Sequence, residues 1–205
     1  MCRRIASGLA GLLLLPVVTL APACQQPGRS TRAEEAVPAG RYPDGSAGLQ
    51  QLWQEVLRAC QRDERQRVHD LLASMMMTQR ELAELLGPHR AAALWPRYQA
   101  LMGSMINPGS VELVAYVYEK KYDDVAVIRV DTLPEAEQQP TDRQVLAAMV
   151  QKRPLYAVRL KRKSEAKGLR YDFFVYLAGR WRTGNQLGKY LNPEEPQPKG
   201  RGSGT

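Results

Sequence analysis

The sequence predicts an α+β domain in which N-terminal helices pack on a curved, mainly antiparallel sheet of five strands. Between residues 49 and 103, apolar side chains recur every three or four residues, the spacing of helices that bury one face. In residues 155–161 and 169–177, apolar side chains instead alternate with other side chains, as in strands with one buried face. Short polar turns join the last runs, and such turns favour antiparallel pairing.

Four helices are expected in the first part of this domain. The apolar stripe of the first helix consists of Leu49, Leu52, Trp53, Val56, Leu57 and Cys60. The second helix includes Val68–Met76, and the third opens with Thr78 and Glu81, whose spacing is that of a capping box. The fourth helix spans residues 89–103 and contains Pro96, which should kink or split it because proline lacks the backbone donor.

Five strands are expected in the second part of the domain. They span residues 111–118, 125–131, 155–161, 169–177 and 180–182. The first two strands are expected to form a hairpin, and the last three a meander. Between these groups, Thr141 and Gln144 have the spacing of a capping box and predict a short helix. Residues 49–191 therefore form a single expected domain, and the Pro- and Gly-rich residues 192–205 a disordered tail.

The first 23 residues have the organisation of a secretory signal. Arg3 and Arg4 precede an uncharged run, Ile5–Leu20, and Ala21 and Ala23 supply the small residues of a cleavage site. This run is marginal in length for crossing a bilayer, so a permanent transmembrane helix is the less favoured interpretation.

The residues around Cys24 resemble the signal of bacterial lipoproteins, in which a cysteine after a small residue is lipidated and becomes the mature N-terminus. The resemblance implies that Cys24 is a lipid anchor that binds the protein to a membrane. Gln25, in the place of an aspartate that favours the inner membrane, implies the outer membrane, facing the periplasm or the cell surface. Ordinary secretion with cleavage after Ala23 is one alternative, and a disulfide between Cys24 and Cys60 is another.

Residues 24–48 are rich in Gln, Pro, Gly, Ala, Ser and charged residues and show no apolar periodicity. Such a composition cannot bury enough apolar surface to fold, so this segment is expected to be a flexible tether. Cys60, by contrast, lies on the apolar stripe of the first helix and is expected to be an ordinary buried thiol.

The net charge of +8 is mildly basic, and its excess lies late in the chain. The residues responsible are Arg159, Lys161, Arg162, Lys163, Lys167, Arg170, Arg180 and Arg182. A basic edge of the sheet could meet anionic lipid. A solvated rim with lysines that protect a sheet edge is the favoured interpretation, and no nucleic-acid partner is expected.

The sequence contains no H-E-x-x-H, no G-x-S-x-G and no phosphate-binding glycine loop. Neither His69 nor His89 has a cysteine or carboxylate at metal-ligand spacing. Consecutive residues of a helix point about 100° apart, so Met75–Met77 are expected to fill the core rather than to share a metal. No cofactor, metal or catalytic residue is therefore predicted from motifs.

The order of elements resembles the nuclear-transport-factor-2-like, or cystatin-like, α+β cone family. The late segment with Phe173, Phe174, Val175, Tyr176, Gly179, Arg180 and Trp181 resembles the closing hairpin of its bacterial secreted members. The resemblance spans residues 49–187 and implies that the N-terminal helices fill the concave face of the sheet. Some members are enzymes that place an acid or base with tyrosines inside the cone. Residues that could take these places here are Asp131, Asp172, Tyr116, Tyr156 and Tyr176.

Three functions are compatible with these observations. The favoured one is a non-enzymatic cell-envelope lipoprotein, anchored at Cys24, that binds another protein or a small apolar ligand or has a structural role. The second is a secreted or anchored isomerase or hydrolase that uses the cone as its pocket. The third is a structural envelope module that forms a homodimer through its sheet. A cone filled by Trp53, Met75 and Trp95 would weaken both pocket hypotheses.

Overall fold

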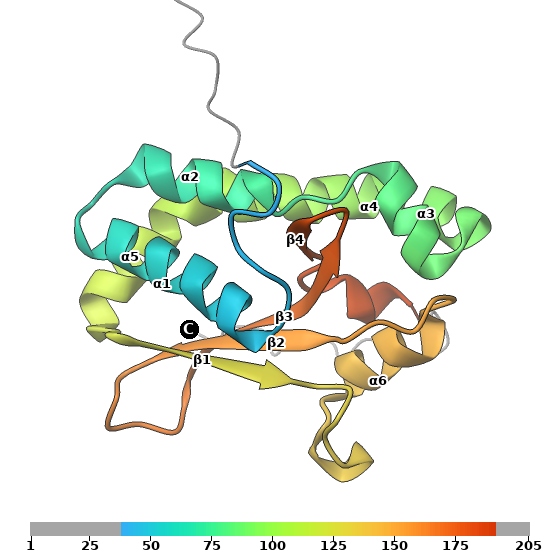
Figure 1. Cartoon of the computed structure of the whole chain (residues 1–205). Coiled ribbons are helices and arrows are strands. Elements are labelled where there is room, and N and C mark those ends of the chain that lie inside the picture. The colour runs from blue at the N-terminus through green and yellow to red at the C-terminus, as the bar shows by residue number, and fades with distance from the viewer. Residues whose placement is uncertain (1–37, 192–205) are drawn as a thin grey trace, which may run out of the picture. The chain divides into compact units, whose positions relative to one another are not determined.

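The computed structural model describes residues 38–191 of the chain, and its fold is α+β (Figure 1). The helices are α1 (Ser46–Gln61), α2 (Arg65–Ser74), α3 (Gln79–Leu86), α4 (Pro88–Ile106), α5 (Gly109–Lys120) and α6 (Pro140–Ala148). The strands are β1 (Asp124–Arg129), β2 (Tyr156–Lys161), β3 (Gly168–Leu177) and β4 (Arg180–Thr183). Two short 3-10 helices are η1 (Glu135–Glu137) and η2 (Leu187–Tyr190). The predicted α+β class is therefore confirmed.

The prediction of a first strand over residues 111–118 is wrong, because this segment forms helix α5. Its buried residues are Ser110, Leu113, Val114 and Val117, which have helical spacing. The β-branched residues in this run favoured a strand, but only a helix buries this set on one side. Tyr118, which the strand prediction treated as part of an apolar run, is 81% exposed.

The sheet within the described residues therefore has four strands rather than five, in the order β1-β2-β3-β4 with every pair antiparallel. The last three strands form the predicted meander, with ends within a few residues of those expected. The chain passes from β1 to β2 through η1 and α6.

A β-bulge interrupts β3 and changes which side chains share a face. Tyr156 pairs with Phe174 and Val158 with Tyr171, so Asp172 and Phe173 together lie opposite Ala157. The prediction that every second residue from Leu169 to Leu177 shares one face of the sheet is therefore wrong. Leu169 and Tyr171 pack in one core, whereas Phe173 and the apolar residues two and four positions later pack in the other.

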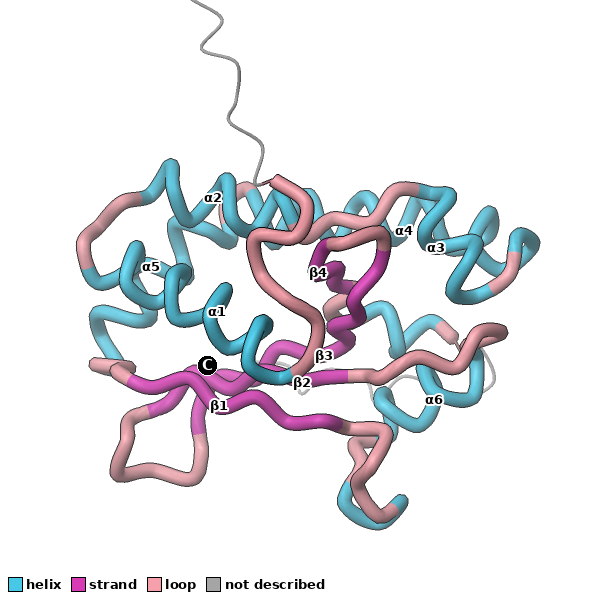
Figure 2. The backbone as a smooth tube through the Cα atoms, viewed as in Figure 1, coloured by secondary structure: helices cyan, strands magenta, loops and turns pink. Residues whose placement is uncertain are grey.

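The two cores share α4 but otherwise involve different helices. The first lies between α1, α2, α5, the end of α4 and the sheet, and Figure 2 shows α1 over β1 and β2. The second contains side chains of α3, α4, α6 and η2 together with the later part of β3. Trp53 is fully buried in the first core, with its ring 4.7 Å from that of Tyr171 and 5.7 Å from that of Phe174. Trp53 and Met75 thus fill the space between the first helices and the sheet.

Two details at helix ends differ from expectation. The capping box of Thr78 and Glu81 is present, but α6 begins earlier than predicted, and Gln139 N–H donates to Asp142 Oδ2 (3.0 Å) at its start. Helix α4 continues through Pro96 to Ile106, so the expected split does not occur.

The final residues of the expected tether pack on the folded domain. Gly40 N–H donates to Gly179 O (2.7 Å), Trp181 Nε1–H donates to Pro43 O (3.1 Å), and Tyr42 is buried. The expected signal (residues 1–23), the anchor Cys24, the start of the tether and the tail lie outside the described residues. Across residues 38–191, no helix has both the length and the apolar character that a membrane span requires.

Candidate binding cleft

Two adjacent cavities open on the surface beside β3. The first, of about 350 Å³, lies between α6, β3 and η2 and is named the α6 cavity. The second, of about 430 Å³, lies between α4, α5 and β3 and is named the α5 cavity. Both are lined by Leu169, Tyr171, Asn185 and Gln186, and the two cavities together are called the cleft. Each volume falls in the range of about 300–1,000 Å³ that is typical of small-molecule sites.

The bulge in β3 places two consecutive residues, Asp172 and Phe173, on the wall of the α6 cavity. Phe173 has a φ of 61°, a left-handed conformation that bulky residues rarely adopt. Its ring is accommodated by Gly184, because a Cβ at that position would lie 2.6 Å from Phe173 Cδ1. Strained backbone of this kind is concentrated at functional sites in proteins, which directs attention to this wall.

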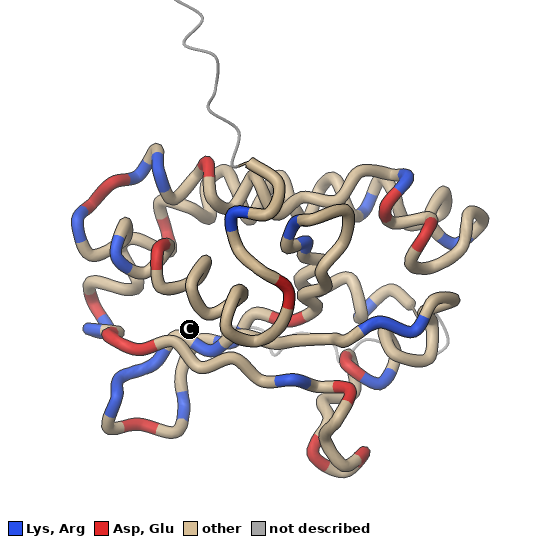
Figure 3. Tube along the Cα trace, in the orientation of Figure 1, with Lys and Arg blue, Asp and Glu red and all other residues tan. Residues whose placement is uncertain are grey.

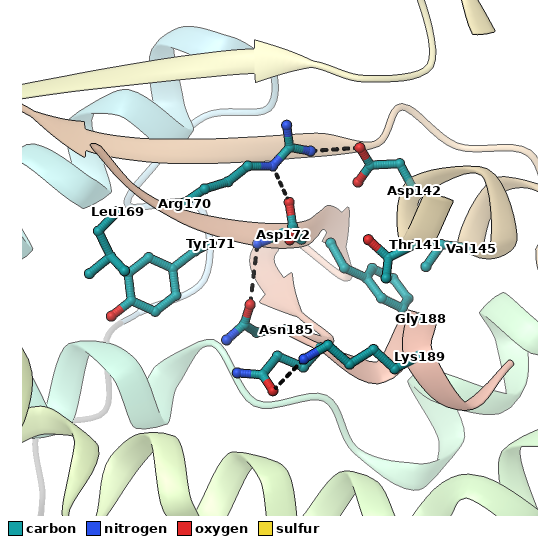
Figure 4. Close-up of a pocket in the computed structure, with 12 residues that line it drawn as sticks. Thr141, Asp142, Val145, Leu169, Arg170, Tyr171, Asp172, Asn185, Gly188 and Lys189 are labelled. Atoms are coloured by element: carbon teal, nitrogen blue, oxygen red, sulfur yellow. Dashed lines mark hydrogen bonds and ion pairs between the residues drawn. The ribbon is translucent and has the colours of Figure 1, made fainter. Parts of the chain in front are cut away.

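Helix η2 closes another side of the α6 cavity by approaching α6 closely. A Cβ on Gly188 would lie 2.8 Å from the carbonyl oxygen of Thr141, so only glycine permits this distance. Gln186, immediately before η2, also has a positive φ of 64°. The chain reversal at this point brings the side chains of Asn185 and Lys189 to the cavity (Figure 4).

Arg170 joins two carboxylates at the edge of the α6 cavity (Figure 4). Its Nη2 donates to Asp142 Oδ2 (2.6 Å), and its Nε donates to Asp172 Oδ1. Asp142 lies in the first turn of α6, so the network connects that helix to β3. Such charge-assisted hydrogen bonds fix the wall of the cavity more firmly than neutral ones.

Burial changes the protonation behaviour of this network. Desolvation raises the pKa of Asp142, and the Asp172 carboxylate adds to the rise, although the Arg170 guanidinium opposes it. Burial works to lower the pKa of Arg170, but the hydrogen bonds to Asp172 and Asp142 and the negative charges of these two acids together raise it. The guanidinium therefore stays charged between the two acids.

The α5 cavity has a more apolar lining than the α6 cavity. Its side chains from the helices include Leu101, Ser104, Met105, Glu112, Leu113 and Tyr116. The Tyr116 ring lies edge-on to that of Tyr122, with centroids 5.8 Å apart. Tyr171 stands at the junction of the two cavities, and burial raises the pKa of its hydroxyl, which remains neutral at physiological pH.

The residues implied by the cone resemblance are not brought together. Asp172 lines the α6 cavity and Tyr116, which is on a helix rather than a strand, lines the α5 cavity. Asp131 instead accepts hydrogen bonds from Leu155 N–H (3.1 Å) and from a neighbouring arginine. The remaining two candidates, Tyr156 and Tyr176, each have a ring centroid 5.3 Å from that of Trp181. Asp172 is half-buried in its ion pair with Arg170.

The sequence motifs judged to be structural occupy structural positions. Met75 and Met77 are buried in different cores, as expected of core-filling residues. Cys60 is 2% exposed, and burial raises the pKa of its thiol to about 12. His69 contacts Asp70 at 3.2 Å, and His89 is exposed. Between residues 38 and 191, no group of three or more His, Cys, Asp or Glu side chains is arranged to hold a metal ion.

Half of the late basic residues are neutralised by acids. The ion pairs are Lys161–Asp124, Arg162–Glu165, Arg170–Asp142 and Arg182–Glu81. Lys163 and Lys167 remain exposed in the loop between β2 and β3, which also carries an acid (Figure 3). This distribution is that of a solvated rim more than of a continuous cationic surface.

Sequence reasoning missed the polar side chains that line the α6 cavity, namely Asp142, Arg170, Asn185 and Lys189. They come from three segments that only the bulge and the close α6–η2 contact bring together. No protein-family model, curated protein or solved structure matches this chain. The cleft places polar side chains of α6, β3 and η2 beside aliphatic side chains of α4 and α5.

Proposed function

We propose that this chain is an exported, lipid-anchored binding protein of the cell envelope, and that the cleft receives a small molecule. The observation that carries the binding role is the meeting of two cavities, of about 350 and 430 Å³, at the same four residues. One cavity is lined by charged and amide side chains, and the other adds aliphatic side chains of α4 and α5 to a mixed lining. This combination is the usual composition of a small-molecule site.

The proposed location rests on the sequence. An uncharged run after Arg3 and Arg4, followed by small residues and Cys24, supports export with lipidation of that cysteine. The first described residues pack on β4, so residues 25–37 would separate the anchored cysteine from the folded part. Gln25 supports the outer membrane as the destination in a cell that has one.

Two observations favour binding in the cleft over an enzyme that uses the cone. Trp53 and Met75 are buried in the first core, whereas Trp95 is only partly buried against the second, and the burial of the first two weakens any pocket there, for a ligand or for catalysis. The carboxylates of Asp142 and Asp172 both form ion pairs with Arg170, so their negative charges are already matched by a guanidinium. The resemblance to the cone family and the curvature of the sheet stay predictions, as does the homodimeric structural module.

Fractionation of cells that express the full chain tests the proposed location. The mature protein should partition with membranes and into the detergent phase, and its N-terminal peptide should carry a diacylglyceryl-sized mass on Cys24. The variant Cys24→Ala should lose both properties. The matched control Cys60→Ala alters a buried thiol and should fractionate like the wild-type protein. Retention of the unmodified chain in the cytosol, or identical behaviour of Cys24→Ala and wild type, would contradict the proposal.

A further inference from the structure

The charges that line the α6 cavity cancel. Asp142 and Asp172 carry negative charge, Arg170 and Lys189 carry positive charge, and no other charged side chain lines this cavity within the described part of the chain. An anionic group placed here would lie near two carboxylates, and a cationic group would lie near the guanidinium and the ammonium. Either would lose hydration for no net electrostatic gain. The cavity is therefore matched to an uncharged polar group.

The free hydrogen-bonding groups of this cavity include both donors and acceptors. Asp172 N–H donates to Asn185 Oδ1 (3.3 Å), and Lys189 Nζ donates to Gln186 Oε1 (3.3 Å). The amide NH₂ groups of Asn185 and Gln186 and the hydroxyl of Thr141 make no hydrogen bond with other residues in the range 38–191. Asp172 Oδ2 is likewise left as an acceptor among the described residues, whereas Oδ1 is directed at Arg170 (Figure 4). A hydroxyl group can both donate and accept, so several hydroxyls on one ligand would fit this mixture.

The α5 cavity next to it is suited to an apolar chain. Leu101, Met105 and Leu113 supply aliphatic surface, and Glu112 is its only charged side chain among the described residues. Methionine adapts its shape to different apolar partners at little cost. Tyr171 lies between the two cavities and presents a ring that stays uncharged. Polar and apolar parts of one ligand would therefore meet at this ring.

We infer that the cleft binds an amphipathic ligand with an uncharged, hydroxyl-rich head and an aliphatic chain, the chemistry of an alkyl glycoside or a glycolipid. The head occupies the α6 cavity and hydrogen bonds to Thr141, Asn185 and Lys189, and the chain occupies the α5 cavity. This inference rests on the proposed binding role of the cleft and names the class of ligand that it takes.

Calorimetric titration of the purified mature protein with matched octyl probes tests the ligand class. Octyl glucoside, octanoate and octylammonium, each below its micellar concentration, share one chain and differ in head-group charge. The Kd of octyl glucoside should be at least about tenfold lower than that of either charged probe. Glucose alone should bind more weakly than octyl glucoside because it leaves the α5 cavity empty.

Variants of the α6 cavity sharpen this test. Thr141→Val keeps the shape of the side chain and removes its hydroxyl, and should weaken octyl glucoside binding by about two- to tenfold, the loss expected for one hydrogen bond. Lys189→Met should weaken it similarly and also favour octylammonium, because the cavity then has a net negative charge. Lys167→Met, on the exposed β2–β3 loop, is the matched control and should bind like the wild type.

The outcomes separate the inference from the proposed function. Tighter binding of octanoate or octylammonium in the wild type, with sensitivity to Thr141→Val or Lys189→Met, would overturn the hydroxyl-rich head and leave the cleft as a binding site. Equal binding of all probes that neither variant changes would show adventitious association of the octyl chain and would also overturn the inference. Absence of binding by every probe would overturn it as well, whereas Cys24 lipidation would still be judged by fractionation.

Discussion

Glu55 is a residue at which the local contacts determine a response to pH. Its carboxylate accepts hydrogen bonds from Arg41 (3.0 Å), from Tyr42 OH (2.7 Å) and from Arg67. Burial works to raise the pKa of Glu55, but the hydrogen bonds from Tyr42 and Arg67 and the nearby positive charges lower it overall. Because Tyr42 precedes α1, this carboxylate fastens the start of the described chain to the first helix.

The lowered pKa of Glu55 gives a prediction with a defined sign. Its contribution to stability is present above the ordinary glutamate value of 4.5 and is lost as the pH falls through the lower value of the folded state. Glu55→Gln should therefore be less stable than wild type at pH 7, and the difference should shrink on acidification to about pH 3. Urea denaturation at both pH values measures this difference.

Glu137→Gln, at an exposed position in η1, is the control and should follow the wild-type pH dependence. A difference between Glu55→Gln and wild type that stays constant from neutral to acidic pH would show that the Glu55 charge does not contribute as described.

For single residues, the sequence predicts which side chains are buried better than it predicts which residues they contact. Trp53 and Cys60 were expected in the core because their spacing places them on one helix face, and both are buried. Whether Asp131 or Asp172 takes the place of an acid or base residue could not be predicted from such spacing. Their partners depend on a strand end and on a bulge, and neither leaves a regular pattern in the sequence.

Among the elements, the bulge of β3 has the largest effect on the cleft. It turns Phe173 toward the second core and leaves Asp172 on the cavity wall, and the ring of Phe173 then occupies the space beside Gly184. Any side chain at that glycine would collide with the ring or displace it. The wall of the α6 cavity therefore depends on Gly184, which does not itself line the cavity.

Substitution of two glycines tests the geometry of the bulge. Gly184→Ala places a Cβ 2.6 Å from Phe173 Cδ1 and should destabilise the fold by about 1–3 kcal/mol, as overpacking does. Gly103→Ala lies in α4 with no atom within 4 Å of the new Cβ, and should stabilise by up to about 1 kcal/mol through helix propensity. Chemical denaturation of both variants gives the comparison. An unchanged or raised stability of Gly184→Ala would mean that Phe173 does not lie where the structure places it.

The elements predicted correctly and incorrectly differ in the length of their patterns. Helices α1 and α2 and the strands of the meander have sustained periodicity, and the sequence predicted each of them. Helix α5 was predicted as a strand because its short run of β-branched and aromatic residues alternates locally. The predicted start of α6 was two residues too late, because the spacings that begin at Gln139 and at Thr141 overlap and both resemble a capping box.

For the whole molecule, the sheet contributes side chains to two cores. Helices of the N-terminal half pack in both, and the cleft lies where α4 and α5 on one side and α6 and η2 on the other approach β3. This location could not be predicted from the sequence, because it requires the long-range contacts of η2 with α6 and α4. The class of the fold depends on local patterns, whereas the site depends on how distant segments meet.

We propose that this protein binds its ligand in the cleft. The most direct measurement is the mapping of amide chemical shifts in the isotope-labelled mature protein during titration with octyl glucoside. The largest changes should occur at residues 169–172 and 185–189, including the side-chain amide of Asn185. Changes confined to the exposed surfaces of α2 and α3, with those residues unaffected at saturation, would contradict this proposal.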